Sequence, residues 1–175
     1  ALCLVLALSQ AWSPAWAQIV ADPTAPGSQR PTVLTAPNGV PLVNITTPSA
    51  AGVSRNTYRQ FDVGSQGAIL NNSRTDVQTQ LGGWVQGNGN LSKGSARVIL
   101  NEVNSSNPSQ LRGFVEVAGQ RAQVVIANPA GIACDGCGFI NANRATLTTG
   151  QAQLHNGAIS GYQVKGGTLS IQGKG

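Results

Sequence analysis

The residues with the clearest chemical potential are two cysteines, Cys134 and Cys137, in the segment NPAGIACDGC at 128–137. A C-x-x-C pair suits a redox centre, half of a zinc site or a small structural disulfide. A thioredoxin-like centre places the pair at a helix start between strands, and zinc needs about four ligands. The pair here follows an Asn-Pro turn, and His155 is the chain's one histidine. We therefore favour a disulfide that pins one turn, with no metal and no other cofactor.

Other enzyme chemistry is not indicated by the sequence. The six acidic residues are isolated and lack the paired-carboxylate pattern of glycoside cleavage. Neither a G-x-S-x-G nucleophile motif nor a D-x-D-x-D calcium pattern occurs. The segment GNGNLSKG at 87–94 lacks the spacing of a phosphate-binding loop, so its Asn88-Gly89 pair is interpreted as a turn. We predict that the chain is not an enzyme.

The first seventeen residues, ALCLVLALSQAWSPAWA, predict a secretory signal peptide whose basic n-region is missing. An apolar run ends at Pro14 and precedes a small-x-small site, which places cleavage between Ala17 and Gln18. Residues 18–175 then form one domain. No later apolar stretch is long enough to cross a bilayer, so we expect no stable membrane insertion. Export also implies an oxidising compartment, in which a cysteine pair forms a disulfide.

The composition favours a folded protein built from strands. The chain is 41% hydrophobic with 10% charged residues, which supports a core rather than disorder. Its polarity comes largely from Asn, Gln, Ser and Thr, and suits stacked strands better than helices. Although the formal net charge is +5, the arginines are spread along the chain without a basic cluster or interleaved aromatics. We expect no nucleic-acid partner.

The elements that must position the cysteines and turns are short apolar runs bounded by turn residues, the pattern of an all-β protein. Strands are predicted at 39–47, 56–64, 67–73 and 96–103, after an extended, proline-rich segment at 18–37. The apolar runs on either side of Ala118-Gly119 predict a β-hairpin over 114–126. The segment 75–84 allows one helical turn, which Gly82-Gly83 would end.

The C-terminal third has a looser repeat. Segments at 138–150, 155–167 and 168–175 each combine a short apolar alternation with a Gly or Asn corner. Such repeats predict the rungs of a parallel β-helix, with His155 at a rung corner. Because the last rung has no capping element, we expect the chain to be the N-terminal piece of a much longer protein.

Three segments in order, 38–73, 79–103 and 111–150, resemble the N-terminal secretion domain of two-partner-secretion exoproteins. The last of them contains LRGFVEVAGQRAQVVIANPAGIACDGC. These exoproteins are filamentous haemagglutinins, large adhesins and contact-dependent growth-inhibition proteins of Gram-negative bacteria. The resemblance implies a right-handed parallel β-helix with an N-terminal cap and extra-helical β-hairpins.

The resemblance also implies a route and a partner. A domain of this family crosses the inner membrane by the Sec machinery. In the periplasm it is recognised by the POTRA domains of a cognate outer-membrane β-barrel transporter, and it leads a large exoprotein to the cell surface. We expect a monomer at this stage. The alternative is a free-standing β-helical adhesin or carbohydrate-binding protein, which a stop codon just after Gly175 would favour.

The family has two asparagine-rich signatures, N-P-N-L and N-P-N-G-I. The first falls on Asn88, Gly89, Asn90 and Leu91, and the second on Asn128, Pro129, Ala130, Gly131 and Ile132. Gly89 replaces Pro, which loosens the first turn. Ala130 replaces Asn, and this variant and the C-x-x-C after it resemble the growth-inhibition branch. Asparagine tolerates left-handed backbone, so we hypothesise that a transporter recognises these turns by strand addition. The first site contributes either to recognition or only to folding.

Overall fold

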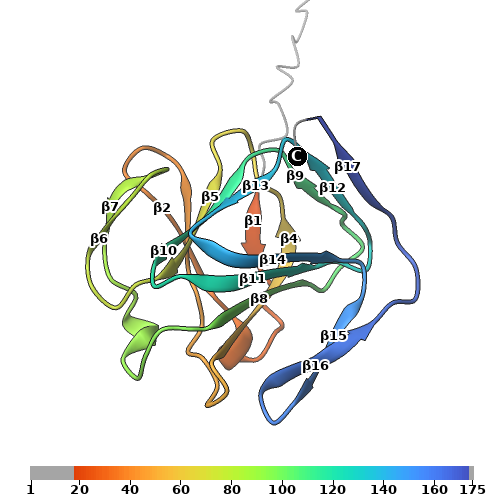
Figure 1. Cartoon of the computed structure of the whole chain (residues 1–175), viewed down its shortest axis with the longest axis horizontal. Helices are drawn as coiled ribbons and strands as arrows, with labels where there is room; N and C mark the ends of the chain where they lie inside the picture. Colours follow the sequence, from red (N-terminus) through yellow and green to blue (C-terminus); the bar gives the residue numbers. More distant parts are fainter. Residues whose placement is uncertain (1–17, 174–175) are drawn as a thin grey trace, which may run out of the picture.

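The computed structural model describes residues 18–173. The predicted signal peptide at 1–17, including Ala17, lies outside the described residues, as do residues 174–175. Regular structure between 18 and 173 consists of β-strands and two short 3-10 helices, η1 (Gly27–Gln29) and η2 (Gly89–Leu91) (Figure 1). No helix in this part of the chain has the length and apolar character needed to cross a membrane. The all-β prediction is confirmed.

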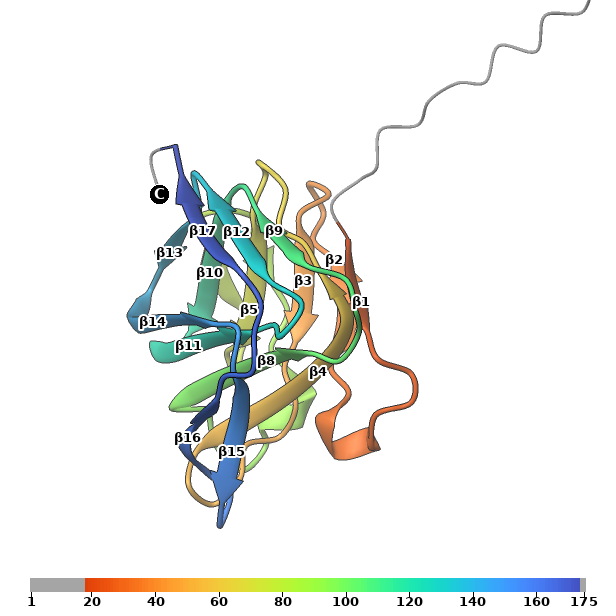
Figure 2. The same ribbon diagram turned by 90° about the vertical axis from the view of Figure 1, so that its right-hand side faces the viewer.

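Three sheets form the walls of the molecule (Figures 1 and 2). Sheet A contains, in spatial order, β1 (Ile19–Ala21), β4 (Val53–Phe61), β8 (Val98–Val103), β11 (Ala122–Ala127) and β14 (Ala142–Thr148). Sheet B contains β13 (Gly138–Ile140), β10 (Phe114–Gly119), β5 (Ala68–Asn72), β3 (Pro41–Asn44) and β2 (Thr32–Thr35). Sheet C contains β17 (Leu169–Gln172), β12 (Ile132–Asp135) and β9 (Ser109–Leu111).

The chain visits sheets B, A and C in the same order on each turn. Strands β5, β8 and β9 form one rung, β10, β11 and β12 the next, and β13, β14 and β17 the last. The first rung consists of β3, β4 and a bridge from Val63 to Leu111. This winding is the right-handed parallel β-helix that the resemblance implies. Strands β1 and β2 pair antiparallel with β4 and β3 and form a cap at the N-terminal end.

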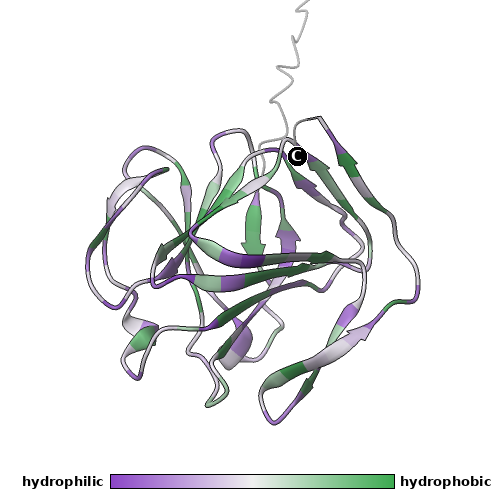
Figure 3. Cartoon of the chain, viewed as in Figure 1, coloured by the Kyte–Doolittle hydropathy of each residue, from purple (hydrophilic) through white to green (hydrophobic). Residues whose placement is uncertain are grey.

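The core consists of side chains that point into the β-helix and stack on their equivalents in the next rung. On sheet A, Ile99 and Val124 are in register, and on sheet B Val43, Leu70 and Val117 are in register; all are buried. Figure 3 shows apolar residues along the strands of these sheets. Each fully buried aliphatic side chain contributes about 1.5–3 kcal/mol. Because these contacts join rungs, each rung depends on its neighbours.

Two β-hairpins pack on the outer faces of the β-helix. They are formed by β6 (Val77–Thr79) with β7 (Gly83–Val85), and by β15 (Gln151–His155) with β16 (Ala158–Gln163). The first covers an apolar patch around Ile69 on sheet B, and the second covers Leu100 and Val125 on sheet A. The turn of the second, Asn156-Gly157, has positive φ at both residues, as a type I′ turn requires. These are the extra-helical hairpins that the resemblance implies.

The predicted hairpin over 114–126 is wrong. Strands β10 and β11 lie in different sheets, and each pairs with strands of neighbouring rungs. Between them the chain turns a corner at Gln120, whose N–H donates to the Asn72 carbonyl at 3.3 Å and whose carbonyl accepts from Asn72 Nδ2 at 2.8 Å. Two β-rich runs around a glycine fit a hairpin and a β-helix corner equally well. The distant partner strands decide between them.

The helical turn allowed at 75–84 is also wrong, because this segment forms the β6–β7 hairpin. The Glu116 carboxylate accepts hydrogen bonds from the N–H groups of Gln80 and Leu81, at 2.7 and 2.8 Å. A buried carboxylate on sheet B therefore holds the hairpin turn. Because Glu116 is distant in sequence, the residues of 75–84 alone do not indicate this contact.

The segment 155–167 is not a rung, because most of it belongs to the β15–β16 hairpin. His155 accordingly lies beside the hairpin turn and not at a rung corner. The Asn-Gly pair after His155 is itself a signal for a two-residue hairpin turn. The strands predicted at 39–47, 56–64, 67–73 and 96–103 are confirmed, as are the rungs at 138–150 and 168–173.

Candidate functional site

The first asparagine corner, Asn88–Leu91, contains η2 and leads into β8. Asn88 is 2% exposed, and its Nδ2 donates to the carbonyl oxygens of Ile45 and Asn71, each at 3.0 Å. Its Oδ1 accepts from the Asn90 N–H at 2.9 Å, which caps η2. Leu91 is fully buried in the core. The corner is thus locked from inside by one amide side chain.

The outward face of this corner is formed by Gly89 and Asn90, both exposed. Asn90 adds a second bond to the first rung, from its Nδ2 to the Ile45 carbonyl at 3.1 Å. Its own carbonyl accepts from Thr47 Oγ1 at 2.9 Å. A Cβ at Gly89 would meet no atom within 4 Å. The corner therefore holds its shape through asparagine, although it lacks the proline of the family signature.

The second corner, 128–132, joins β11 to β12 and repeats this arrangement. Asn128 is 0% exposed, and its Nδ2 donates to the Asn107 carbonyl at 2.9 Å and to Ser109 Oγ at 3.0 Å. Its Oδ1 accepts from the Ala130 N–H at 3.0 Å. As in the first corner, the amide closes a turn over its own chain and binds the rung before it.

Pro129 and Gly131 complete the second turn. Pro129 is exposed, whereas Gly131 is buried with φ +125°, a left-handed backbone that side chains disfavour. Ile132 enters the core, and its N–H donates to the Thr168 carbonyl at 3.0 Å. The left-handed conformation thus belongs to the glycine, and our assignment of it to asparagine is wrong. Asn88 itself is extended, with φ −86° and ψ 112°.

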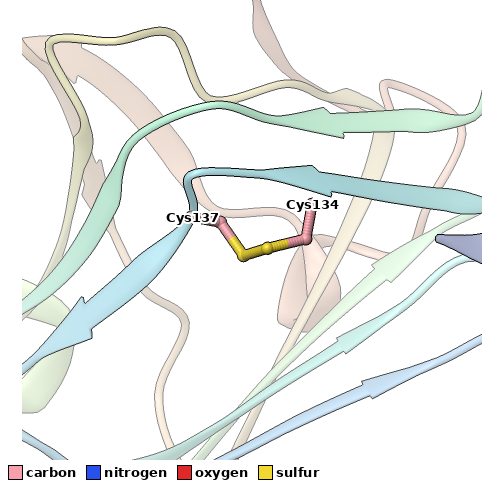
Figure 4. The surroundings of a disulfide bond; sticks show 2 residues. All are labelled: Cys134 and Cys137. Carbon is pink, nitrogen blue, oxygen red and sulfur yellow. A yellow bond between two sulfur atoms is a disulfide. The ribbon is translucent and has the colours of Figure 1, made fainter. Parts of the chain in front are cut away.

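The next corner, after β12, holds a disulfide between Cys134 and Cys137 (Figure 4). The two Cα atoms lie 5.3 Å apart. Cys134 is buried, and Cys137 packs against the core at the start of the path to β13. Gly136 between them has φ +73°, which glycine adopts at little cost. The predicted disulfide is confirmed.

The two asparagine corners are not brought together. The first precedes β8 and the second follows β11, and these strands are parallel neighbours of 6 residues each. A strand of this length spans about 20 Å, so the two corners lie at opposite ends of the strands of sheet A. The sequence interpretation missed other buried asparagines whose amides bond to backbone carbonyls; these are Asn56, Asn71, Asn72 and Asn101. Their position in apolar strands was the available signal.

Comparison with known proteins places these corners in a family. The family model described as TPS secretion domain matches residues 17–175. The chain is 64% identical over 172 residues to Toxin CdiA of Yersinia pestis, and 44% identical over 178 residues to 16S rRNA endonuclease CdiA of Enterobacter cloacae subsp. cloacae. These alignments cover 98% and 100% of this chain. The chain belongs to the TPS secretion domain family.

The fold of this TPS domain agrees with a solved relative. The crystal structure of the filamentous hemagglutinin secretion domain matches 87% of this chain and 49% of that chain, with a TM-score of 0.79 and 40% sequence identity. The chain spans about 5% of the length of the two CdiA relatives, so their toxin and nuclease names describe far larger proteins. TPS exoproteins cross the outer membrane of Gram-negative bacteria, and the domain implies a cognate outer-membrane transporter as partner.

In this TPS domain the second corner borders a groove of about 490 Å³ next to the N-terminal cap, with Pro129 on its lining. The groove contains the Arg55–Glu102 ion pair, with Nε and Oε2 2.7 Å apart. Hydrogen bonds from the hydroxyl and backbone N–H of Thr24 hold the pKa of Asp22 below its usual range. Each of these three charged groups thus has a hydrogen-bond partner within the domain. Pro129 is exposed at the rim of this groove.

Proposed function

We propose that this TPS domain is the part of a large exoprotein that a cognate outer-membrane transporter recognises in the periplasm, after Sec-dependent export. The transporter's POTRA domains bind the domain as a monomer, and the domain has no catalytic role. It leads a surface adhesin, haemagglutinin or contact-dependent inhibition toxin to the cell surface. The observation that supports this is the exposure of Gly89, Asn90 and Pro129 on two corners that are locked from within.

Buried and exposed signature residues have different tasks in this proposal. The amides of Asn88 and Asn128 have all their hydrogen bonds inside the fold, so a partner does not contact them while the domain is folded. They set the shape of the turns. The outward residues and the adjoining backbone supply the surface to which a transporter segment adds, with backbone hydrogen bonds for affinity and side chains for register.

The β-helix also supports a role in moving the exoprotein outward. In a solenoid each repeat contacts mainly its neighbours, so folding can propagate one rung at a time. The last described rung, β13, β14 and β17, offers strand edges on all three sheets. In proteins as long as the CdiA relatives, folding of later segments outside the cell would favour outward movement without ATP.

The experiment is a secretion and binding assay with the cognate transporter. Asn90→Ala and Pro129→Ser alter the outward faces of the two corners. Matched controls are Asn143→Ala and Pro37→Ser, which change exposed residues of the same types elsewhere. We expect the corner variants to stay folded by circular dichroism, to bind the transporter's periplasmic domains about tenfold more weakly and to be secreted poorly. Full binding and secretion of both folded corner variants would overturn recognition through these corners.

A further inference from the structure

A second groove, of about 420 Å³, lies between the β15–β16 hairpin and the outer face of sheet A. One wall is β16, whose residues 158–162 line the groove. The opposite wall includes Gln123 and Arg144, which are in register on neighbouring strands of sheet A. In the described part of the chain β16 pairs with β15 alone, so its other edge carries no strand. Residues of β16 line this groove and those of β15 do not.

The groove is cationic. Arg97 and Arg144 both line it, and the described chain places no carboxylate there. Within residues 18–173 the single ion pair is Arg55–Glu102, so Arg97 and Arg144 have no acidic partner in that range. Both side chains are exposed. Planar guanidinium groups that are free of internal carboxylates are suited to bind carboxylates bidentately.

The positive charge continues toward the first asparagine corner. Arg97 also lines an adjoining groove of about 510 Å³ together with Lys93, which lies two residues after η2. Strands β8 and β14 are separated only by β11, so the backbones near Arg97 and Arg144 lie about 10 Å apart. Three cations therefore line the two adjoining grooves, and we call Lys93, Arg97 and Arg144 the basic track.

The strand with the free edge, β16, lines the same groove as Arg97 and Arg144. The hairpin crosses sheet A from the last rung to the first, where Ser49 Oγ donates to the Gly157 carbonyl at 2.8 Å. Tyr162 lines the same groove. Burial raises the pKa of the Tyr162 hydroxyl, and the nearby charge of Arg144 opposes this shift. At neutral pH the hydroxyl is therefore protonated and is a further donor for an anion.

We propose that this groove binds an extended acidic segment of a partner protein. The segment adds to the free edge of β16 as a third strand, and its carboxylates reach Arg97 and Arg144. Strand edges with unpaired N–H and C=O groups recruit extended chains in this way. A concave site with a strand edge on one wall suits a polypeptide better than the flat surface of an anionic membrane. The site goes beyond the transporter proposal, because its test needs no transporter.

The test uses a synthetic peptide of four Glu-Thr repeats, which presents carboxylates on one face of a strand. We expect it to bind the domain in an NMR titration and to slow amide hydrogen exchange in β16. The double variant Arg97→Gln/Arg144→Gln should weaken binding at least tenfold. The control Arg112→Gln/Arg121→Gln removes the same charge from exposed arginines elsewhere, and should change binding less than twofold.

Several results would overturn the inference. These are equal weakening by both double variants, equal binding of a Gln-Thr peptide, unchanged exchange in β16, or no binding at millimolar peptide. The last measurement tests whether phosphatidylglycerol vesicles bind the domain. If they bind with the same dependence on Arg97 and Arg144 and displace the peptide, the groove is a membrane site instead. Because the transporter is absent, none of these outcomes bears on recognition by the asparagine corners.

Discussion

The two asparagine corners share one internal design and differ on the outside. In each, the amide oxygen accepts from the N–H two residues on, and the amide nitrogen donates to two acceptors on neighbouring chain segments. Outside, the first corner presents Gly89 and Asn90, and the second presents Pro129, with a disulfide at the following corner. The folding function of the signature thus lies in its buried asparagine, and the outward positions can vary without loss of the turn.

The acceptors differ between the corners, yet loss of the asparagine should cost a similar amount in each. Asn88 donates to two backbone carbonyls, whereas one of the two acceptors of Asn128 is the Ser109 hydroxyl. Without Asn88 the Ile45 carbonyl still accepts from Asn90 Nδ2 at 3.1 Å, and without Asn128 the Ser109 hydroxyl can rotate toward another partner. Each substitution therefore removes the amide donor from one backbone carbonyl that has no second side-chain donor, that of Asn71 or of Asn107.

The largest effects are expected from Asn88→Ala and Asn128→Ala. Leaving buried polar groups without partners costs about 1–3 kcal/mol each, in addition to the lost turn. We expect losses of about 3 kcal/mol for both Asn88→Ala and Asn128→Ala in urea unfolding, against less than about 0.5 kcal/mol for exposed Asn143→Ala. Losses at the two corners that differ by more than about 1 kcal/mol would contradict the similarity argued from their acceptors.

The next largest difference in stability is expected between substitutions of the two corner glycines. Gly131 has φ +125°, and a Cβ there would lie 3.2 Å from the Thr168 carbonyl oxygen. Gly89 has open space and no left-handed backbone. Strain of this kind costs about 1–3 kcal/mol, so Gly131→Ala should lower stability by about 2–3 kcal/mol. Gly89→Ala is the matched control and should stay within about 0.5 kcal/mol of the parent. Equal losses would mean that the second turn is not the more constrained one.

The disulfide should contribute less than either buried asparagine. It closes a loop between residues 134 and 137, and the chain-entropy model gives about 2 kcal/mol for so short a loop. We expect Cys134→Ala/Cys137→Ala to have a free energy of unfolding, measured with urea, that is lower by that amount. In a matched measurement, reductant is added to the parent protein and to the double variant. Only the parent should lose stability in urea. A response from both proteins would place the effect of reductant elsewhere.

The corners also show how far sequence could predict this molecule. The β-helix was predictable mainly from the family resemblance, and the disulfide and both turns were predictable because Asn, Pro, Gly and Cys carry strong local preferences. The partner of each strand was not. Gln120 turns a corner because Asn72 of the preceding rung binds it on both sides, and the 75–84 hairpin forms over Glu116. Such contacts join residues about 35 to 50 positions apart, which a local pattern cannot contain.

The smallest effect is expected from a variant that gives the first corner the proline of the second corner. Gly89→Pro should stabilise the domain by about 0.4–1 kcal/mol, since proline restricts the unfolded chain where the native backbone already suits it. The position is compatible: Asn88 is extended, as a residue before proline prefers. Gly89 begins a 3-10 turn, and a Cβ there meets no atom. Pro129→Gly is the reciprocal change and should destabilise by a similar amount. If Gly89→Pro instead lowers the urea midpoint, the first turn differs from the second in its backbone and not only in its exposed residues.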